Sequence, residues 1–223
     1  MTHLDTELIK LKQQLFEMWL LVISQVETSR EALLNFDKGA ASEVAFKEKM
    51  VDTYELKIDR DCENIIALYN PVAPDLRLTL AVLKINADLE RIGDFARGIA
   101  RFIKKSPKKS INPELLKVCQ IDDLIKNAVD MLTDAKTAFE NENSRMALSI
   151  FSQDDFLDDV HKSSNKIIAD YIKKHPDEID EALHLHSIIR KVERIGDHCS
   201  NIAEEIIFFL EAKVLKHSGK KKL

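Results

Sequence analysis

Residues that interrupt helices are scarce in this chain, whose 223 residues include only 5 glycines and 5 prolines. That scarcity is typical of long helices joined by short loops. No run approaches 18 consecutive apolar residues, so we expect no membrane-spanning segment. The first ten residues are amphipathic and include acidic side chains, so we also expect no signal peptide.

Cysteine is equally rare and shows no metal-binding or redox pattern. The 3 cysteines, Cys62, Cys119 and Cys199, are scattered along the chain, and none belongs to a CxxC motif. We interpret them as free, buried thiols of a protein in a reducing cytosol.

Excess positive charge is absent too. The net charge is −5 and the pI is about 5.8, which argues against an extended nucleic-acid-binding surface. The sequence also lacks a glycine-rich phosphate loop, a nucleophile elbow and any recognisable catalytic triad. Hydrophobic residues make up 45% of the chain and charged residues 32%, which is a globular composition with enough apolar side chain for a core.

What the chain does contain is one pentapeptide, Glu-Arg-Ile-Gly-Asp, that occurs twice. It covers residues 90–94 and 193–197, an offset of 193 − 90 = 103 residues. Apolar residues at helical spacing surround both copies and match at the same offset: Val82, Ile85, Leu89, Ile92, Ala96, Ile99 and Ile103 against Leu185, Ile188, Val192, Ile195, Cys199, Ile202 and Ile206. A chance match would not bring its helical stripe with it, so we infer an internal duplication.

Apolar periodicity and breaks predict three helices in each half. In the first half, a helix from about Leu4 to Phe36 ends before Gly39, a second covers 51–68, and a third follows the break at 70–74 and reaches about 103. The second half starts a helix at Pro113, capped by Asn112, and repeats the pattern. We therefore predict an all-α fold of two tandem three-helix bundles, with domains 1–107 and 108–217 and a basic tail at 218–223.

The repeated carboxylates are candidate functional residues. On a helix, residues four apart are neighbours, so Glu90 lies beside Asp94 and Glu193 beside Asp197, at the border between core and solvent. Two interpretations stay open: ordinary solvated charges, or a metal site completed by a second helix. Suitable carboxylates for the metal site are Asp52, Glu55 and Asp59 in the first half and Asp155, Asp158 and Asp159 in the second. The mid-helix Gly93 and Gly196 suggest close approach of another backbone or a ligand.

Histidines offer a competing metal motif. Glu181 and His184 have the ExxH spacing of ferritin-like di-iron proteins, but such a site needs two motifs and the first half has Ala81 in place of the histidine. His161 and His198 are interpreted as surface residues and not as ligands.

Two segments, residues 86–94 and 192–204, resemble the paired signature of the PhoU family of phosphate-uptake regulators. They read NADLERIGD and VERIGDHCSNIAE. The family pattern is an acidic residue, three others, Asp, three others, then Asp or Asn. Glu193, Asp197 and Asn201 match it, whereas the first copy has Gly98 at the third position, so a first site would lack one ligand or would fill its place with water or with carboxylates of the second helix.

The resemblance implies a function that spacing alone does not show. It implies a non-enzymatic, cytoplasmic negative regulator of phosphate transport and phosphate homeostasis, peripheral to the membrane through its partners and forming a homodimer. The implied partners are the ATPase subunit of the phosphate ABC transporter and the phosphate-sensing histidine kinase. The implied cofactor is a divalent or trivalent metal ion (iron, zinc, manganese or magnesium). The alternative is a metal-dependent helical-bundle enzyme, a hydrolase or di-iron protein, that uses the same carboxylates.

Overall fold

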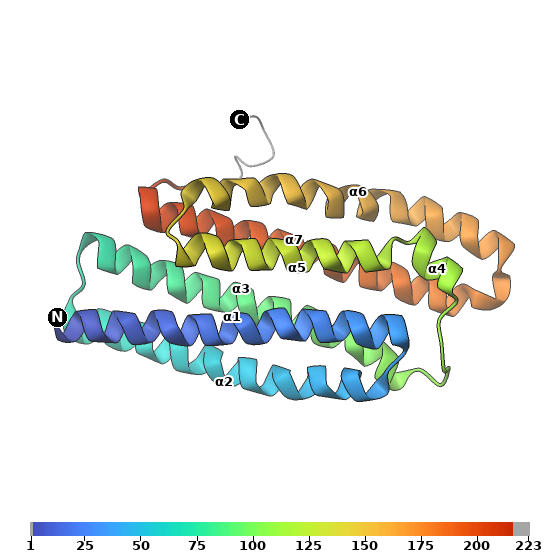
Figure 1. Ribbon diagram of the computed structural model, residues 1–223, viewed down its shortest axis with the longest axis horizontal. Coiled ribbons are helices and arrows are strands. Elements are labelled where there is room, and N and C mark those ends of the chain that lie inside the picture. Colours follow the sequence, from blue (N-terminus) through green and yellow to red (C-terminus); the bar gives the residue numbers. More distant parts are fainter. Residues whose placement is uncertain (1, 216–223) are drawn as a thin grey trace.

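The computed structural model describes residues 2–215 as two layers of long helices (Figure 1). The first half forms α1 (His3–Asn35), α2 (Lys38–Tyr69) and α3 (Ala73–Lys105). The second half forms the short α4 (Pro113–Val118), then α5 (Ile121–Glu140), α6 (Ser144–Lys174), the 3₁₀ turn η1 (Pro176–Glu178) and α7 (Ile179–Glu211). No strand occurs between residues 2 and 215, and the predicted fold of two tandem three-helix bundles is confirmed.

Polar side chains begin several of these helices. Asp37 accepts hydrogen bonds from the backbone at the start of α2, Asn112 caps α4, and Asn143 caps α6. The predicted end of the first helix at about Phe36 is confirmed, but Gly39 is not the residue that follows that end. The chain turns at Phe36, which adopts φ 52°, and Gly39 already lies in the first turn of α2 because Asp37 starts that helix earlier.

The second half departs from the expected pattern at its first helix. The predicted start, Asn112 followed by Pro113, is confirmed, but the helix that begins there already ends at Val118. Gln120 has φ 50°, a left-handed conformation that ends α4 and lets α5 begin at Ile121 in a new direction.

The apolar stripes that flank the two pentapeptides form the centre of the molecule. All fourteen predicted stripe residues, seven on α3 and seven on α7, are buried in the structure. Burial of this apolar area is the main force that holds each bundle together. The three cysteines are free and buried, as predicted.

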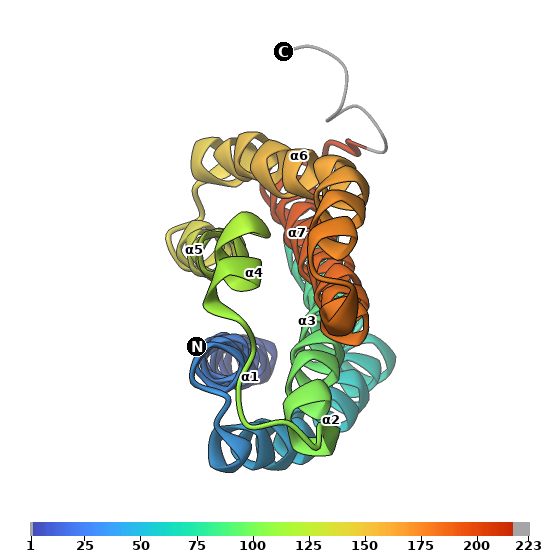
Figure 2. The same ribbon diagram turned by 90° about the vertical axis from the view of Figure 1, so that its right-hand side faces the viewer.

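The two bundles also pack against each other along their length. α3 runs antiparallel to α7 in the middle of the molecule, and α1 lies against α5 (Figures 1 and 2). The indole of Trp19 on α1 is fully buried and donates a hydrogen bond to the Leu132 carbonyl of α5 at 3.1 Å. The bundles therefore share a continuous apolar core.

The connection between the halves runs from the end of α3 at Lys105 to Pro113. The boundary predicted at residues 107 and 108 falls in this segment, and the division into two domains stays a prediction. The predicted tail at 218–223 lies outside the described residues. None of the helices described is long and apolar enough to cross a membrane.

Candidate functional site

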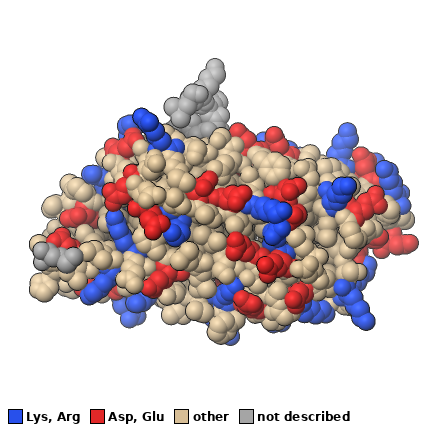
Figure 3. Space-filling view, in the orientation of Figure 1, with Lys and Arg blue, Asp and Glu red and all other residues tan. Residues whose placement is uncertain are grey.

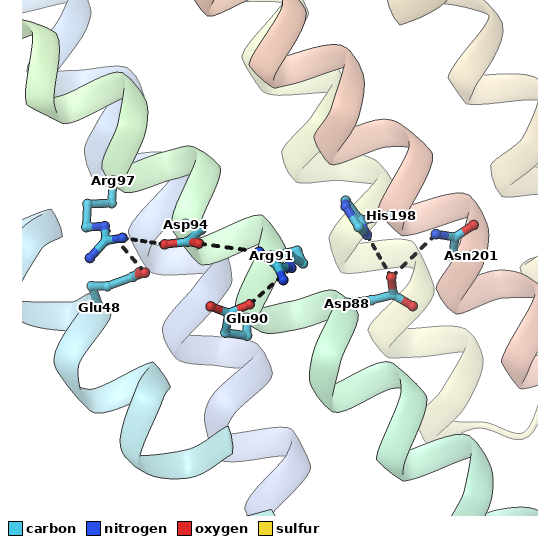
Figure 4. A network of polar contacts seen from close by, with 8 residues as sticks. All are labelled: Glu48, Asp88, Glu90, Arg91, Asp94, Arg97, His198 and Asn201. Atoms are coloured by element: carbon cyan, nitrogen blue, oxygen red, sulfur yellow. Dashed lines mark hydrogen bonds and ion pairs between the residues drawn. The ribbon is translucent and has the colours of Figure 1, made fainter. Parts of the chain in front are cut away.

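The first carboxylate row consists of Glu90 and Asp94 on α3, and it faces α2. Glu90 is 18% exposed at its side chain and Asp94 is 30% exposed. Both lie at the border between core and solvent, as predicted. Arg91 stands 3.6 Å from Glu90 and 3.9 Å from Asp94, and Arg97 donates to Asp94 at 2.5 Å (Figure 4).

Helix α2 brings further carboxylates to this row. Burial raises the pKa of Glu55, and the negative charges of Asp59 and Asp52 raise it further. Burial likewise raises the pKa of Glu90, with further increases from Asp94 and Glu55. These carboxylates therefore repel one another across the α2–α3 interface. Asp59 also accepts a hydrogen bond from the side-chain amide of Asn86 on α3, at 2.9 Å.

The sequence reasoning missed Glu48, the most deeply buried carboxylate of the row. Its residue is 1% exposed, and it accepts a hydrogen bond from Gln25 of α1 at 2.5 Å while Arg97 lies 3.6 Å away. Burial raises the pKa of Glu48 to about 7, against the hydrogen bond from Gln25, and a hydrogen bond with Asp94 favours the protonated form. A signal was available, since Glu48 falls on the buried stripe of α2 between Val44 and Val51.

Gly93 makes room for this arrangement. A Cβ at position 93 would come within 2.9 Å of Gln25 Oε1 and 3.1 Å of Glu48 Oε2. Gln25 also donates to the Gly93 carbonyl at 3.3 Å. The close approach expected at this glycine is made by the side chains of Gln25 and Glu48, where another backbone or a ligand was expected.

The second carboxylate row, Glu193 and Asp197 on α7, faces α6 as the first row faces α2. The residues of α6 and α2 correspond at a different sequence offset from those of α7 and α3. A Cβ at Gly196 would lie 2.5 Å from both Asp154 Oδ1 and Leu157 Cδ1 of α6. In the first half the corresponding contacts to Gly93 come from Glu48 and Val51, so α6 matches α2 at 154 − 48 = 157 − 51 = 106 residues. Asp154 is buried and, like Glu48, was missed by sequence reasoning.

The same offset shows where the two rows differ. Asp52 corresponds to Asp158, but Glu55 corresponds to His161. His161 lies 3.4 Å from Glu193, so the second row sets an imidazole beside the carboxylate where the first sets another acid. Asp155 and Asp159 are exposed, and Lys162 lies 3.3 Å from Asp158 and 3.7 Å from Asp159. The expected surface position of His161 is therefore only partly right.

Asn201 and His198 of α7 reach the other bundle. Both contact Asp88 of α3, His198 Nδ1 at 2.7 Å and Asn201 Nδ2 at 3.4 Å (Figure 4). His198 was expected on the surface, but its side chain is only 20% exposed, because α3 of the other bundle covers it. These contacts join the two bundles, and the proposed role of Asn201 as a metal ligand stays a prediction.

The carboxylate rows suit a hard cation in their chemistry, because oxygen atoms of Asp and Glu are the ligands such ions prefer. The mutual repulsion within the first row is what a cation would relieve. In the structure, Arg91 and Arg97 supply the neighbouring positive charge. Within residues 2–215, no three His, Cys, Asp or Glu side chains converge closely enough to enclose a metal ion.

The PhoU domain family matches twice, at residues 15–103 and 121–206. The chain belongs to the PhoU family. The two matches coincide with the two bundles and with the duplication inferred from the pentapeptide.

Relatives and solved structures of the PhoU family agree over almost the whole chain. The phosphate-specific transport system accessory protein PhoU homolog of Pseudomonas putida is 33% identical over 98% of this chain and 85% of its own. The crystal structure of PhoU from Pseudomonas aeruginosa has a TM-score of 0.89 at 31% identity, covering 94% of this chain and 99% of its own. For PhoU from Streptococcus pneumoniae, a phosphate transport system regulatory protein, the TM-score is 0.84 at 26% identity, covering 95% and 99%.

Proposed function

We propose that this chain is a non-enzymatic regulator of phosphate transport and of phosphate-starvation signalling in the cytoplasm. The observation that carries the proposal is full-length similarity to phosphate-specific transport system accessory proteins. The duplicated carboxylate rows support it, because they lie at the surface border of two bundles and offer charge to a partner. The proposed partners are the ATPase subunit of the phosphate transporter and a phosphate-sensing histidine kinase.

We further propose that each row binds a divalent or trivalent metal ion. In the first half Glu90 and Asp94 with Glu55 and Asp59 would hold it, and in the second half Glu193, Asp197, Asp158 and Asn201. These side chains would have to move closer together than they lie in the structure. The ion would supply positive charge that links a row to an acidic or polar group of a partner. Oxygen donors favour iron, manganese or magnesium, and the imidazole of His161 near Glu193 makes zinc compatible with the second row.

Charge on the outer surface is compatible with electrostatic docking. Figure 3 shows acidic and basic side chains interspersed on the face seen in Figure 1.

Helix α2 adds exposed apolar side chains, including Phe46, Met50 and Leu56 at 64%, 41% and 67% exposure. Exposed apolar residues beside charged ones are a feature of protein-binding surfaces. This helix is our proposed face for homodimer formation.

The substitution Glu193→Gln tests whether a row is needed for regulation. It keeps the shape of the side chain and removes its charge, so we expect a melting temperature close to that of the wild type. Cells that carry it in place of the wild-type gene should express phosphate-starvation genes several-fold above normal in phosphate-rich medium. The control is Glu31→Gln, which alters an exposed carboxylate of α1 outside both rows. Normal repression in the Glu193→Gln strain would show that the row is dispensable.

Salt dependence tests the adaptor role. Binding of the purified protein to membranes that contain the phosphate transporter should fall several-fold as ionic strength rises, because screening weakens contacts between opposite charges. The double substitution Asp94→Asn and Asp197→Asn should weaken binding at low salt, and a chelator should do the same if a metal forms the link.

A matched double substitution separates the rows from overall charge. Glu31→Gln with Asp130→Asn removes two negative charges from exposed positions outside both rows and outside every carboxylate considered for a metal site. It should leave membrane binding unchanged. A protein that ignores these membranes at low salt, and instead turns over a small substrate with added metal, would favour the helical-bundle enzyme over the adaptor.

A further inference from the structure

A cleft lies at one end of the interface between the bundles, beginning one helical turn beyond Asp94 along α3. The C-terminal half of α3, the N-terminal half of α7 and the start of the connecting segment line a cavity of about 460 Å³. This end of α3 and α7 is at the right of Figure 1. The volume falls within the range of small-molecule sites.

The charged side chains that line the cleft are mostly cationic, in a chain of net charge −5. Its charged residues are four cations and two acids: Arg101, Lys105, Lys108, Lys191, Asp180 and Glu181. Lys108 forms an ion pair with Glu181, so that one cation and one acid of the lining neutralise each other. Between residues 2 and 215, no carboxylate lies within ion-pair distance of Arg101, Lys105 or Lys191. The cleft therefore has positive charge in excess of its internal partners.

Lys191 is the least exposed of these four cations. Its side chain is partly covered, and its ammonium donates only to the hydroxyl and carbonyl oxygens of Ser187, at 2.7 and 3.3 Å. Burial lowers the pKa of Lys191, and the neighbouring positive charge of Arg190 lowers it further. An anion in the cleft would supply a balancing negative charge.

Gly98 allows Lys191 to take this position. A Cβ at position 98 would lie 3.0 Å from Lys191 Cε and 3.2 Å from Cδ, so only glycine leaves full room for the stem of the lysine to cross α3. Gly98 is also the residue at which the first copy departs from the family signature, since the second copy has Asn201 there. The glycine that leaves the first carboxylate row without a third oxygen ligand therefore also gives Lys191 room to line the cleft.

We propose that this cleft binds a small phosphate-bearing anion. Lys and Arg together are the side chains that recognise phosphate oxygens, Arg through its planar fork and Lys as a compact charge. Phe102 and His184 stack at 4.6 Å between their ring centres and form an aromatic wall beside the cations. Inorganic phosphate, an inorganic polyphosphate and a phosphate ester share the chemistry that this lining recognises. The proposal rests on the cleft alone and is independent of the proposed regulatory role.

Calorimetric titration of the full chain tests the proposal. The probes are inorganic phosphate, tripolyphosphate and ATP, with sulfate as the comparison anion, all without added metal. At least one phosphate probe should bind more tightly than sulfate. Binding by ATP alone would identify a phosphate ester as the ligand class, and binding by phosphate or tripolyphosphate an inorganic anion. Equal affinity for sulfate, or no binding by any probe, would overturn the proposal.

Two substitutions locate the binding. Lys191→Met keeps the stem and removes the charge, and it should weaken binding by about tenfold or more, as expected for a charged hydrogen bond. Gly98→Asn introduces the residue of the second copy and should weaken binding by displacing Lys191. The matched control is Lys84→Met, which alters a lysine of the same interface that pairs with Glu205 outside the cleft.

Melting temperatures of all three variants confirm that they are folded. Unchanged affinity in both Lys191→Met and Gly98→Asn would place the anion elsewhere and overturn the assignment. Failure here would leave the regulatory role standing, because that role depends on Glu193 and the carboxylate rows. Conversely, normal phosphate-starvation repression in the Glu193→Gln strain would not affect the titrations.

Discussion

Replacing Glu48 by glutamine should stabilise the protein at pH 8 and leave its stability nearly unchanged at pH 4. The pKa of Glu48 is about 7 in the folded chain and 4.5 as its ordinary value. A raised carboxyl pKa means that the folded state prefers the protonated form. Stability from this residue is therefore full below pH 4.5 and is lost as pH rises through about 7. The loss is on the order of 3 kcal/mol from a difference of about 2.5 pKa units.

Glutamine resembles the protonated acid, so Glu48→Gln should lack this loss. Urea unfolding at a series of pH values measures it, with a gain of about 2 to 3 kcal/mol expected for the variant at pH 8. Glu63→Gln, on the exposed side of the same helix, is the control and should follow the wild type at every pH. If Glu48→Gln were less stable than the wild type at pH 8, the ion pair with Arg97 would outweigh the cost of burying the carboxylate.

Replacing Gly196 by valine should cost about 3 kcal/mol of stability or more, at the upper end of what overpacking a core costs. A Cβ there would lie 2.5 Å from both Asp154 Oδ1 and Leu157 Cδ1, and both residues are buried. Neither can move without displacing its own neighbours, and the branched side chain adds two further carbons. For a chain of this size the melting temperature should fall by roughly 6 to 12 °C.

Gly98→Val is the matched control for Gly196→Val. Only the flexible end of Lys191 meets a side chain at position 98, and valine has a better helix propensity than glycine. Its melting temperature should stay within a few degrees of the wild type. An equal fall in both variants would show that β-branching in these helices, and not the contact with α6, sets the cost.

The helices and the duplication could be predicted because they follow from periodic, local information. The stripe from Val82 to Ile103 and its counterpart on α7 identify the buried face of each helix without reference to any neighbour. Sequence breaks such as residues 70–74 end helices for reasons of backbone geometry alone. The position of Glu90 and Asp94 at the border of that face follows from the same count.

The residues that sequence reasoning missed depend on what lies opposite. Glu48 and Asp154 occupy stripe positions on α2 and α6, and a carboxylate on a buried stripe in both halves was a readable signal. Gln25 likewise follows Val22 on the buried stripe of α1, but its bond to Glu48 depends on how α1 meets α2. The contact of Asn201 with Asp88 depends on how two bundles meet, and periodicity assigns a helix face without naming the helix that covers it.

The antiparallel packing of α3 on α7 has an evolutionary consequence. Asp88 corresponds to Lys191 and Gly98 to Asn201 at the repeat offset, since 191 − 88 = 201 − 98 = 103. In a dimer of identical half-length ancestors, an isologous contact between these two positions would have occurred twice with the same residues. Fusion into one chain removed that identity. One copy of the contact became the hydrogen bond from Asn201 to Asp88, and the other became a lysine lying across a glycine beside a cavity. Two identical subunits could not have evolved a joint at one place and a ligand site at its counterpart.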